Sequence, residues 1–310
     1  MALDRFQRVA LLTTVTTYLL IGVGGLVRAS GAGLGCPDWP QCFGLWIPPL
    51  SAEGLPAGWD AASFNVFKTW TEYINRLLGA VTGLLILATL ILAVLDHRRS
   101  PRVLAATTAA FVLVLFNGWL GGVVVKSGLA PLILTGHLVF ALLVVSCLLY
   151  ATMQAFFPPG EIRARGSRSE MGVATLVVLA GVLLQVGVGA FLRGEVQDVA
   201  AVGVPREEWL AHVGWVETLH QLLAPFTVAA VVVVSGLAIR EPDPWTRRVG
   251  QASAALVLVQ GVAGLGLDVF AFPRILQVVH LWAASLLLGT LTAQALLAWR
   301  IDPRVARTAS

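Results

Sequence analysis

The sequence predicts an all-α membrane protein with eight transmembrane helices, arranged as two tandem four-helix bundles. Hydrophobic residues make up 57% of the 310 residues and charged residues only 12%, whereas a soluble domain carries roughly 25% charged residues. Eight apolar runs each approach the roughly 20 residues that a helix needs to cross a bilayer. Such long runs lack the alternation of barrel strands, so helices are expected. Similar polar motifs, Glu-Tyr-Ile-Asn-Arg at 72–76 and Glu-Thr-Leu-His-Gln at 217–221, recur in the two halves. This repetition predicts an internal duplication.

The predicted spans are 9–27, 77–95, 103–125, 132–157, 171–192, 218–239, 249–267 and 275–299. The first run is longer than the roughly 7–15-residue apolar core of a cleaved signal peptide, so we expect an uncleaved anchor. Four spans per half divide the chain into a first repeat at 1–157, a cytoplasmic linker at 158–170 and a second repeat at 171–310.

The distribution of basic residues predicts the orientation. With the N-terminus inside, most Lys and Arg residues fall on the inner segments, as expected for helices that obey the positive-inside rule. Both termini are therefore expected in the cytoplasm, and the protein in the cell (plasma) membrane. The formal net charge of +4 is attributed to interaction with anionic lipid headgroups rather than with nucleic acid.

The longest outer loop, 28–70, carries Cys36 and Cys42 among glycines and prolines. On the oxidising side of a membrane these two cysteines are expected to form a disulfide, either as a structural staple or as a redox-active pair. The equivalent loop of the second half, 193–215, holds no cysteine. Cys147 lies inside the fourth span, where an isolated thiol is expected to be a small buried hydrophobe.

Four polar residues lie at similar depth below the outer ends of the even-numbered spans: Asn75, His137, His220 and His280. Ionisable groups within spans are unfavourable and are expected to face the bundle interior. Imidazoles from separate helices, without further carboxylate or thiolate ligands, fit haem better than zinc or a di-iron centre. His137, His220 and His280 are therefore predicted metal ligands, with His220 and His280 as an axial pair.

The other two histidines are predicted to have no part in this site. His97 lies in a basic inner loop and is expected to be exposed to solvent. His212 precedes the sixth span and is expected in the outer loop or in the first turn of that span.

Charged residues at the outer edge complete the candidate site. Glu72 lies three residues before Asn75, so the two share a helix face. Glu72 is expected either to stabilise the helix start or to accept a proton beside a bound substrate. Arg28, Arg76 and Arg193 are expected either to pair with haem propionates or to act as snorkelling anchors.

The chain resembles the haem A synthase family over nearly its whole length. The motifs that carry the resemblance are Gly-Leu-Gly-Cys-Pro-Asp-Trp-Pro at 33–40 with its second cysteine Cys42, the Glu-x-x-His-Arg element at 72–76, Gly-His at 136–137, Glu-x-x-His-Gln at 217–221, and His280. Together these motifs are specific for the family.

The resemblance implies a haem b held by His220 and His280, and haem O as substrate in the first half beside Glu72. The family reaction implies two successive hydroxylations of a ring methyl group of haem O, followed by dehydration to the formyl group of haem A. The implied partners are haem O, haem A, haem O synthase and terminal oxidase assembly factors.

Asn75 departs from the family pattern, which usually has a histidine at this position. Asparagine is a poor iron ligand compared with imidazole. His137 is then expected to be the sole strong ligand in the first half, with one face of the iron open for chemistry. We therefore expect the first half to be the reactive one.

Two other functions predict features that this sequence does not show. A non-catalytic b-type cytochrome electron carrier should hold equivalent six-coordinate haems in both halves, and Asn75 argues against it. A haem transporter is disfavoured because repeats of four spans each run in the same orientation, whereas many transporters have inverted repeats.

Overall fold

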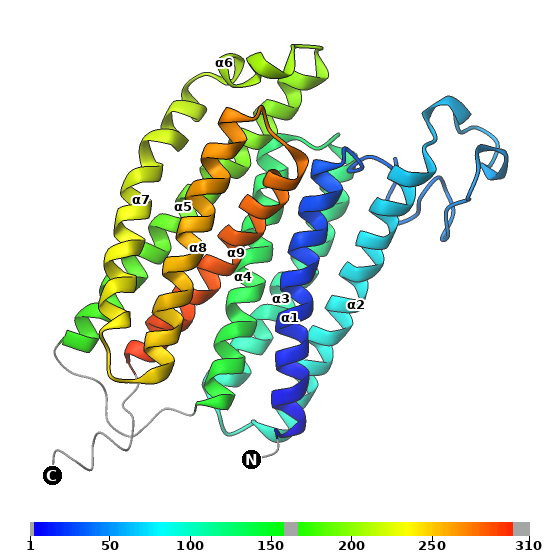
Figure 1. Cartoon of the computed structure of the whole chain (residues 1–310). Helices are drawn as coiled ribbons and strands as arrows, with labels where there is room; N and C mark the ends of the chain where they lie inside the picture. Colours follow the sequence, from blue (N-terminus) through cyan, green and yellow to red (C-terminus); the bar gives the residue numbers. More distant parts are fainter. Residues whose placement is uncertain (1–2, 158–166, 300–310) are drawn as a thin grey trace, which may run out of the picture.

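The computed structural model describes residues 3–157 and 167–299 and shows a bundle of long helices (Figure 1). Within these ranges eight helices are long and apolar enough to cross a membrane. They are α1 (Arg5–Ala29), α2 (Val66–Asp96), α3 (Pro101–Lys126), α4 (Pro131–Phe156), α5 (Ser167–Ala201), α7 (Trp215–Ile239), α8 (Pro244–Val269) and α9 (Arg274–Ala298). The prediction of an all-α, multi-pass membrane protein is therefore confirmed.

Short elements fill the loops at one end of the bundle. They are two 3₁₀ turns in the long first loop, Ala52–Gly54 and Ala61–Ser63, a third at Arg206–Glu208, and the five-residue helix α6 (Trp209–Val213). The first turn of α1 and the last turn of α9 both lie at the opposite end of the bundle, one in each half of the view (Figure 1).

Two helices are longer than the predicted spans. Helix α2 begins at Val66 rather than at 77, because Asn65 caps it by accepting from the Lys68 amide at 3.0 Å. Helix α5 runs from Ser167 to Ala201 rather than from 171 to 192, since a helix need not end where its apolar stretch ends. The predicted linker 158–170 lies mostly outside the described residues, and α5 already begins within its last part.

The helices pack as two groups of four. In the first group, α1 and α3 each pack against both α2 and α4, so α2 and α4 lie on one diagonal. In the second group, α5 and α8 each pack against both α7 and α9, so α7 and α9 lie on the corresponding diagonal. This is the arrangement expected of two four-helix bundles. The internal duplication, the domain boundaries and the side on which the termini lie stay predictions.

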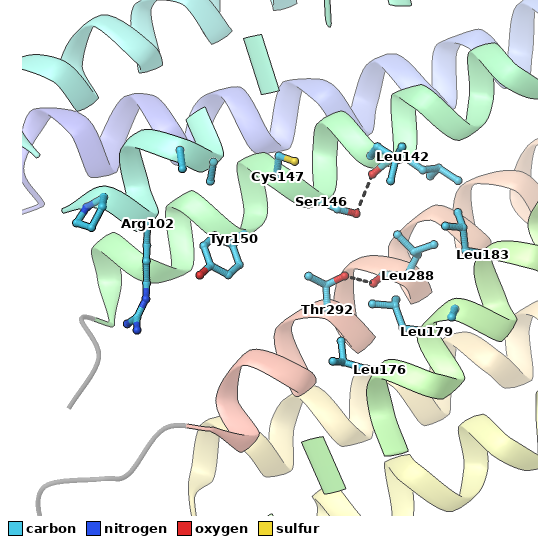
Figure 2. Close-up of a pocket in the computed structure, with 15 residues that line it drawn as sticks. Arg102, Leu142, Ser146, Cys147, Tyr150, Leu176, Leu179, Leu183, Leu288 and Thr292 are labelled. Atoms are coloured by element: carbon cyan, nitrogen blue, oxygen red, sulfur yellow. Dashed lines mark hydrogen bonds between the residues drawn. The ribbon is translucent and has the colours of Figure 1, made fainter. Parts of the chain in front are cut away.

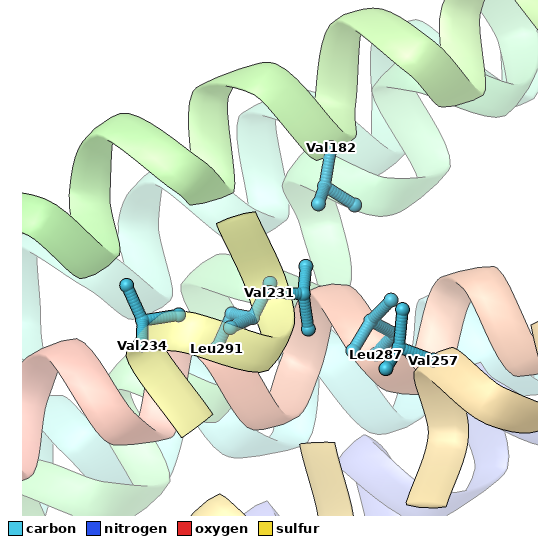
Figure 3. Close-up of a cluster of buried hydrophobic side chains, with 6 residues drawn as sticks. All are labelled: Val182, Val231, Val234, Val257, Leu287 and Leu291. Atoms are coloured by element: carbon cyan, nitrogen blue, oxygen red, sulfur yellow. The ribbon is translucent and has the colours of Figure 1, made fainter. Parts of the chain in front are cut away.

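Each group has its own apolar core. Figure 3 shows that of the second group, where branched side chains from α5, α7, α8 and α9 meet. Its buried members are Val182, Val231, Val234, Val257, Leu287 and Leu291. A further cluster around Ile21, Leu142 and Leu288 fills the seam between the groups.

Small residues let α1 and α9 approach closely across this seam. A Cβ at Gly22 would lie 3.3 Å from the indole nitrogen of Trp282, and one at Gly25 would lie 2.8 Å from Leu281. The Trp282 indole donates to the Tyr18 carbonyl at 2.9 Å. Glycine on one helix and a large side chain on the other is a common packing mode in membranes. The two groups are thereby held with their polar landmarks at the same end.

Candidate functional site

A disulfide-bonded loop covers the end of the first group at which α2 begins. Cys36 and Cys42 are bonded, with an S–S distance of 1.98 Å, and both are fully buried. They pack with Phe43 and, less deeply, with Trp59 and Tyr73. Within the loop Asp38 accepts from the Phe43 and Gly44 amides at 2.6 and 2.8 Å. The predicted disulfide is thus present, in a loop that has its own small core.

Glu72 lies where this loop meets α2, and only 4% of its surface is exposed. Its Oε2 accepts from the Cys36 amide at 2.8 Å. Its Oε1 accepts from Arg76 Nη2 at 2.6 Å and from Nε at 3.2 Å. One helical turn earlier, Thr69 donates to the Gly35 carbonyl at 2.9 Å. The carboxylate is therefore fixed by the cysteine loop on one side and by its helical neighbour on the other.

Arg76 uses all of its hydrogen-bond donors within the protein. Besides the two bonds to Glu72, Nη1 donates to the Asp38 and Gln41 carbonyls at 2.7 and 2.8 Å, and Nη2 donates to the Cys36 carbonyl at 3.1 Å. A guanidinium has five N–H donors, and these contacts engage each of them. The geometry indicates that Arg76 anchors the loop to α2. Its pairing with a haem propionate stays a prediction, and none of its donors is left free for that role.

Glu217 and Gln221 are the corresponding pair of the second group. Gln221 donates to Glu217 Oε1 at 2.7 Å, again one turn apart on an exposed helix start. The equivalent loop of the second half holds no cysteine, and Gln221 stands in the place of Arg76, the residue that holds the cysteine loop in the first group.

His220 and His280 face each other across the α7/α9 diagonal. Their ring centroids are 6.5 Å apart and the ring planes lie at 73°. Imidazole nitrogens bind metals at about 2 Å and the ring centroid lies about 1 Å behind the nitrogen, so two rings on opposite sides of one iron have centroids roughly 6–6.5 Å apart. The pair therefore fits the two axial positions of a haem iron.

The described residues contain no group of three or more His, Cys, Asp or Glu side chains that could hold a metal ion. Zinc and di-iron sites need such a group. A porphyrin supplies four nitrogens of its own and needs only two axial ligands, so haem fits this pair better than a bare metal does.

Each of the four polar landmarks stands opposite a glycine of a neighbouring helix. The distances from a Cβ placed on the glycine are 2.7 Å for Gly189 to His220 Cε1, 3.2 Å for Gly264 to His280 Cε1, 3.3 Å for Gly121 to His137 Cε1 and 3.9 Å for Gly24 to Asn75 Oδ1. At three of these positions a larger residue would push the imidazole aside. The glycines therefore make room for the rings, and they do so at corresponding positions in both groups.

Buried polar atoms without a partner gather around these landmarks. Among the described residues they include Nδ1 of His137, His220 and His280, Oδ1 of Asn75 and Asn117, Oε1 of Gln185 and Gln260, and Nε and Nη2 of Arg28. An unsatisfied buried polar group is unfavourable by about 1–3 kcal/mol. Their concentration at one end of both groups is typical of a site that binds a polar or metal-containing group.

Three amides in this set, Gln185, Asn117 and Gln260, were not among the predicted site residues. Gln260 Nε2 lies 3.1 Å from His280 Nε2, and Gln185 donates to the His220 carbonyl at 2.9 Å. Gln185, Asn117 and Gln260 each stand four residues before a glycine that faces a histidine. This shared position relative to the glycine is the signal that could have found them.

His137 and Asn75 occupy the α2/α4 diagonal of the first group, which corresponds to the α7/α9 diagonal of the second. His137 lies six residues into α4, as His280 does in α9, and His220 lies five residues into α7. At about 1.5 Å rise per residue, all three rings lie roughly 8–9 Å below the helix starts. The three histidines therefore share the predicted depth relative to their helix starts, whereas Asn75 lies nine residues into the longer helix α2, about 14 Å from its start.

Arg28 and Arg193 differ in their surroundings. Arg193 donates from Nε to Gln277 at 2.9 Å, and Gln277 in turn donates to the Phe272 carbonyl at 2.8 Å. Gln277 precedes His280 by three residues, whereas Leu134 takes that place before His137. Arg28 accordingly has two buried nitrogens without a partner among the described residues. A buried cation of this kind needs an anion to stabilise it.

The two remaining histidines lie away from these sites. His212 is exposed on α6, with Nδ1 2.9 Å from the Glu208 carbonyl, which agrees with its predicted place before the sixth span. His97 was predicted to be exposed, and this was wrong: it is half-buried, because its ring packs on Phe6 with centroids 4.5 Å apart. It closes the end of the first group opposite the candidate site.

Comparison with known proteins gives matches over most of the chain. Residues 7–292 match the family described as cytochrome oxidase assembly protein, COX15-CtaA. A haem A synthase of Caulobacter sp. strain K31 is 28% identical over 96% of this chain and 97% of that protein. One of Methylobacterium sp. strain 4-46 is 25% identical over 93% of this chain and 91% of that protein.

A third relative is more similar over a shorter stretch. The haem A synthase of Shewanella oneidensis is 34% identical over 188 residues, which are 59% of this chain and 54% of that protein. The family match nevertheless spans all eight membrane helices, apart from the ends of α1 and α9. On the strength of this match, the chain belongs to the COX15-CtaA family of cytochrome oxidase assembly proteins.

Proposed function

We propose that this protein is a haem A synthase, which oxidises a ring methyl group of haem O to the formyl group of haem A for the assembly of terminal oxidases. Relatives named haem A synthase that align with more than nine-tenths of the chain support this function over that of a non-catalytic b-type electron carrier. The observation that carries the proposal is the difference between the two diagonals. One presents two imidazoles and the other presents His137 with Asn75.

The second group would hold haem b. His220 and His280 would hold its iron, since the separation of the two rings leaves room for one iron between them. Bound there, haem b would supply reversible one-electron transfer. Arg193 lies about two turns before the end of α5 and donates from Nε to Gln277. Its remaining donors would pair with a propionate.

The first group would bind haem O as the substrate. His137 would be the sole strong ligand to the substrate iron, and Asn75 on the opposite helix would leave the second face open. Arg28 would pair with a propionate of haem O, because its Nε and Nη2 are buried without a partner. This division of roles follows from Asn75. Because asparagine is a poor iron ligand, the first group would offer one strong ligand where the second offers two.

Glu72 would accept a proton at Oε1 or Oε2 during the oxidation. It lies three residues before Asn75, which places it on the same face of α2 toward the loop. Its bonds to the Cys36 amide and to Arg76 hold the carboxylate in one position and limit its access to water. Cys36 and Cys42 would act as the staple of the loop that supplies these bonds.

We further place the protein in the plasma membrane with both termini in the cytoplasm and the haem sites toward the outer face. The end of the bundle that carries the disulfide would then be the oxidising side. Haem O synthase and terminal oxidase assembly factors would be its functional neighbours. The shared order of amide, glycine and histidine in the two groups supports an origin by internal duplication.

The experiment that tests the function is pigment analysis. The protein is expressed in a host that makes haem O but has no haem A synthase of its own, and the extracted haems are identified by mass. Haem A together with haem b is the expected result. Haem b alone would instead identify the electron carrier.

The role of Glu72 needs a variant that keeps its hydrogen bonds. Glu72→Gln retains an oxygen that accepts from the Cys36 amide but no longer takes up a proton. We expect it to abolish the conversion of haem O while the absorbance of haem b in the second group is unchanged. Glu217→Ala, at the corresponding place of the second group, is the matched control and should still convert haem O. Full conversion by Glu72→Gln would remove Glu72 from the mechanism.

A further inference from the structure

A large apolar cavity lies between the two helix groups, away from the histidines. Its volume is about 790 Å³, within the range of about 300–1,000 Å³ that is common for ligand sites. Side chains of α3 and α4 line one side and those of α5 and α9 line the other, and Figure 2 shows them facing each other across the opening. Ser146 lies nine residues after His137 on α4, which is half a turn away around the helix. The cavity is therefore separate from the proposed haem sites.

The walls of the cavity favour hydrocarbon. The Ser146 hydroxyl donates to the Leu142 carbonyl at 2.8 Å, and the Thr292 hydroxyl donates to the Leu288 carbonyl at 2.8 Å (Figure 2). Both hydroxyl donors are thus used within their own helices and are not free for a ligand. A polar metabolite would lose its hydrogen bonds to water here without replacement.

The length of the cavity matches one leaflet of a bilayer. It extends along α4 from Leu142 to Tyr150, which is about 12 Å at 1.5 Å per residue. Half of a hydrocarbon core about 30 Å thick is about 15 Å. A single acyl chain that enters from the leaflet at the Tyr150 end would fill most of this depth.

A cationic side chain marks that end. Arg102 is exposed at the cavity mouth next to Tyr150 (Figure 2), and within residues 3–157 and 167–299 no acidic side chain forms an ion pair with it. Further exposed arginines lie at the same end of the bundle, at Arg98, Arg99 and Arg247. Positive charge beside an apolar slot complements an anionic lipid headgroup.

We propose that this cavity binds an anionic phospholipid, with one acyl chain between the two helix groups and its phosphate on Arg102. The bound chain would fill the seam below the cluster of Ile21, Leu142 and Leu288. It would thereby stabilise the packing of one group against the other. The proposal does not depend on which haem either group binds.

Native mass spectrometry of the protein released from phosphatidylglycerol nanodiscs tests the site. We expect one retained phosphatidylglycerol on the unmodified chain and about tenfold weaker retention for Arg102→Gln, the lower end of what a hydrogen bond to a charged group contributes. Arg99→Gln is the matched control, because Arg99 is exposed at the same end but does not line the cavity. It should retain the lipid as the unmodified chain does.

Cys147 gives an independent measurement, since it lines the cavity and carries a free thiol, whereas Cys36 and Cys42 are bonded to each other. Its alkylation by N-ethylmaleimide should be several-fold slower in phosphatidylglycerol than in phosphatidylcholine nanodiscs. In Arg102→Gln the two rates should become equal.

Three results would overturn the proposal. One is equal retention of phosphatidylcholine, which would identify ordinary boundary lipid. Another is equal loss of lipid in Arg99→Gln, which would indicate diffuse attraction. The third is recovery of an isoprenoid quinone from the cavity in place of phospholipid.

Discussion

Replacing Arg76 by methionine would test whether this residue anchors the cysteine loop to α2. Methionine keeps much of the length of the side chain and removes all five hydrogen bonds, three of them to the loop carbonyls of Cys36, Asp38 and Gln41. It also leaves Glu72 as a buried carboxylate without its cation. The exposed fractions of the two side chains are 15% for Arg76 and 5% for Glu72, so little solvent can replace the lost contact.

The size of the effect follows from this burial. Removing one partner of a buried ion pair destabilises by about 3–5 kcal/mol, and we take the lower end because part of Arg76 reaches solvent. A loss of about 3 kcal/mol increases the opening of the junction by roughly a hundredfold, since 1.4 kcal/mol is tenfold. The disulfide and the Asp38 contacts lie within the loop itself, so the loop should detach without unfolding.

Hydrogen exchange of individual amides reads this opening directly. The Cys36 amide, which donates to Glu72, should exchange roughly a hundred times faster in Arg76→Met, because exchange from a transiently opened junction follows the opening equilibrium. The Phe43 and Gly44 amides, which donate to Asp38, should change much less. Adding Glu72→Gln should restore part of the protection of Cys36, because a neutral amide leaves no unpaired buried charge.

Gln221→Met is the control for this experiment. It removes the single contact from Gln221 to Glu217 at the corresponding place of the second group and should leave the Cys36 amide unaffected. Exchange of that amide at the original rate in Arg76→Met would refute the anchoring role, and so would an equal effect of Gln221→Met.

Two further predictions concern the haem sites. Gly189→Ala should lower haem b retention by about tenfold or more, as expected for a change that displaces a ligand, because its Cβ would lie 2.7 Å from His220 Cε1. Gly187→Ala, with open space at that position, should retain haem b in the same absorbance titration. Asn75→His should give the first group two imidazoles, so a six-coordinate absorbance spectrum should appear there while haem O conversion falls. Conversion at the original rate with both ligands bound would show that an open iron face is not needed opposite His137.

The membrane helices were predictable because a bilayer imposes one strong requirement on the sequence. Each span must supply about 20 apolar residues, and that signal placed all eight helices even where α2 and α5 proved longer. The depth of the histidines was also predictable, because a fixed rise per residue converts position in a span into distance from the helix start. The disulfide followed from two cysteines close together in one loop that was predicted to lie on the outer side.

The orientation of each helix about its own axis was decided only by the tertiary structure. Every span is apolar on most of its surface, so the sequence could not show that α7 and α9 lie on a diagonal and bring His220 and His280 to 6.5 Å. It also could not show that loop carbonyls accept hydrogen bonds from Arg76, whereas Nε and Nη2 of Arg28 are buried without a partner. Close packing at small residues determines which side of each membrane helix faces its neighbours. Such contacts exist only once the helices have assembled.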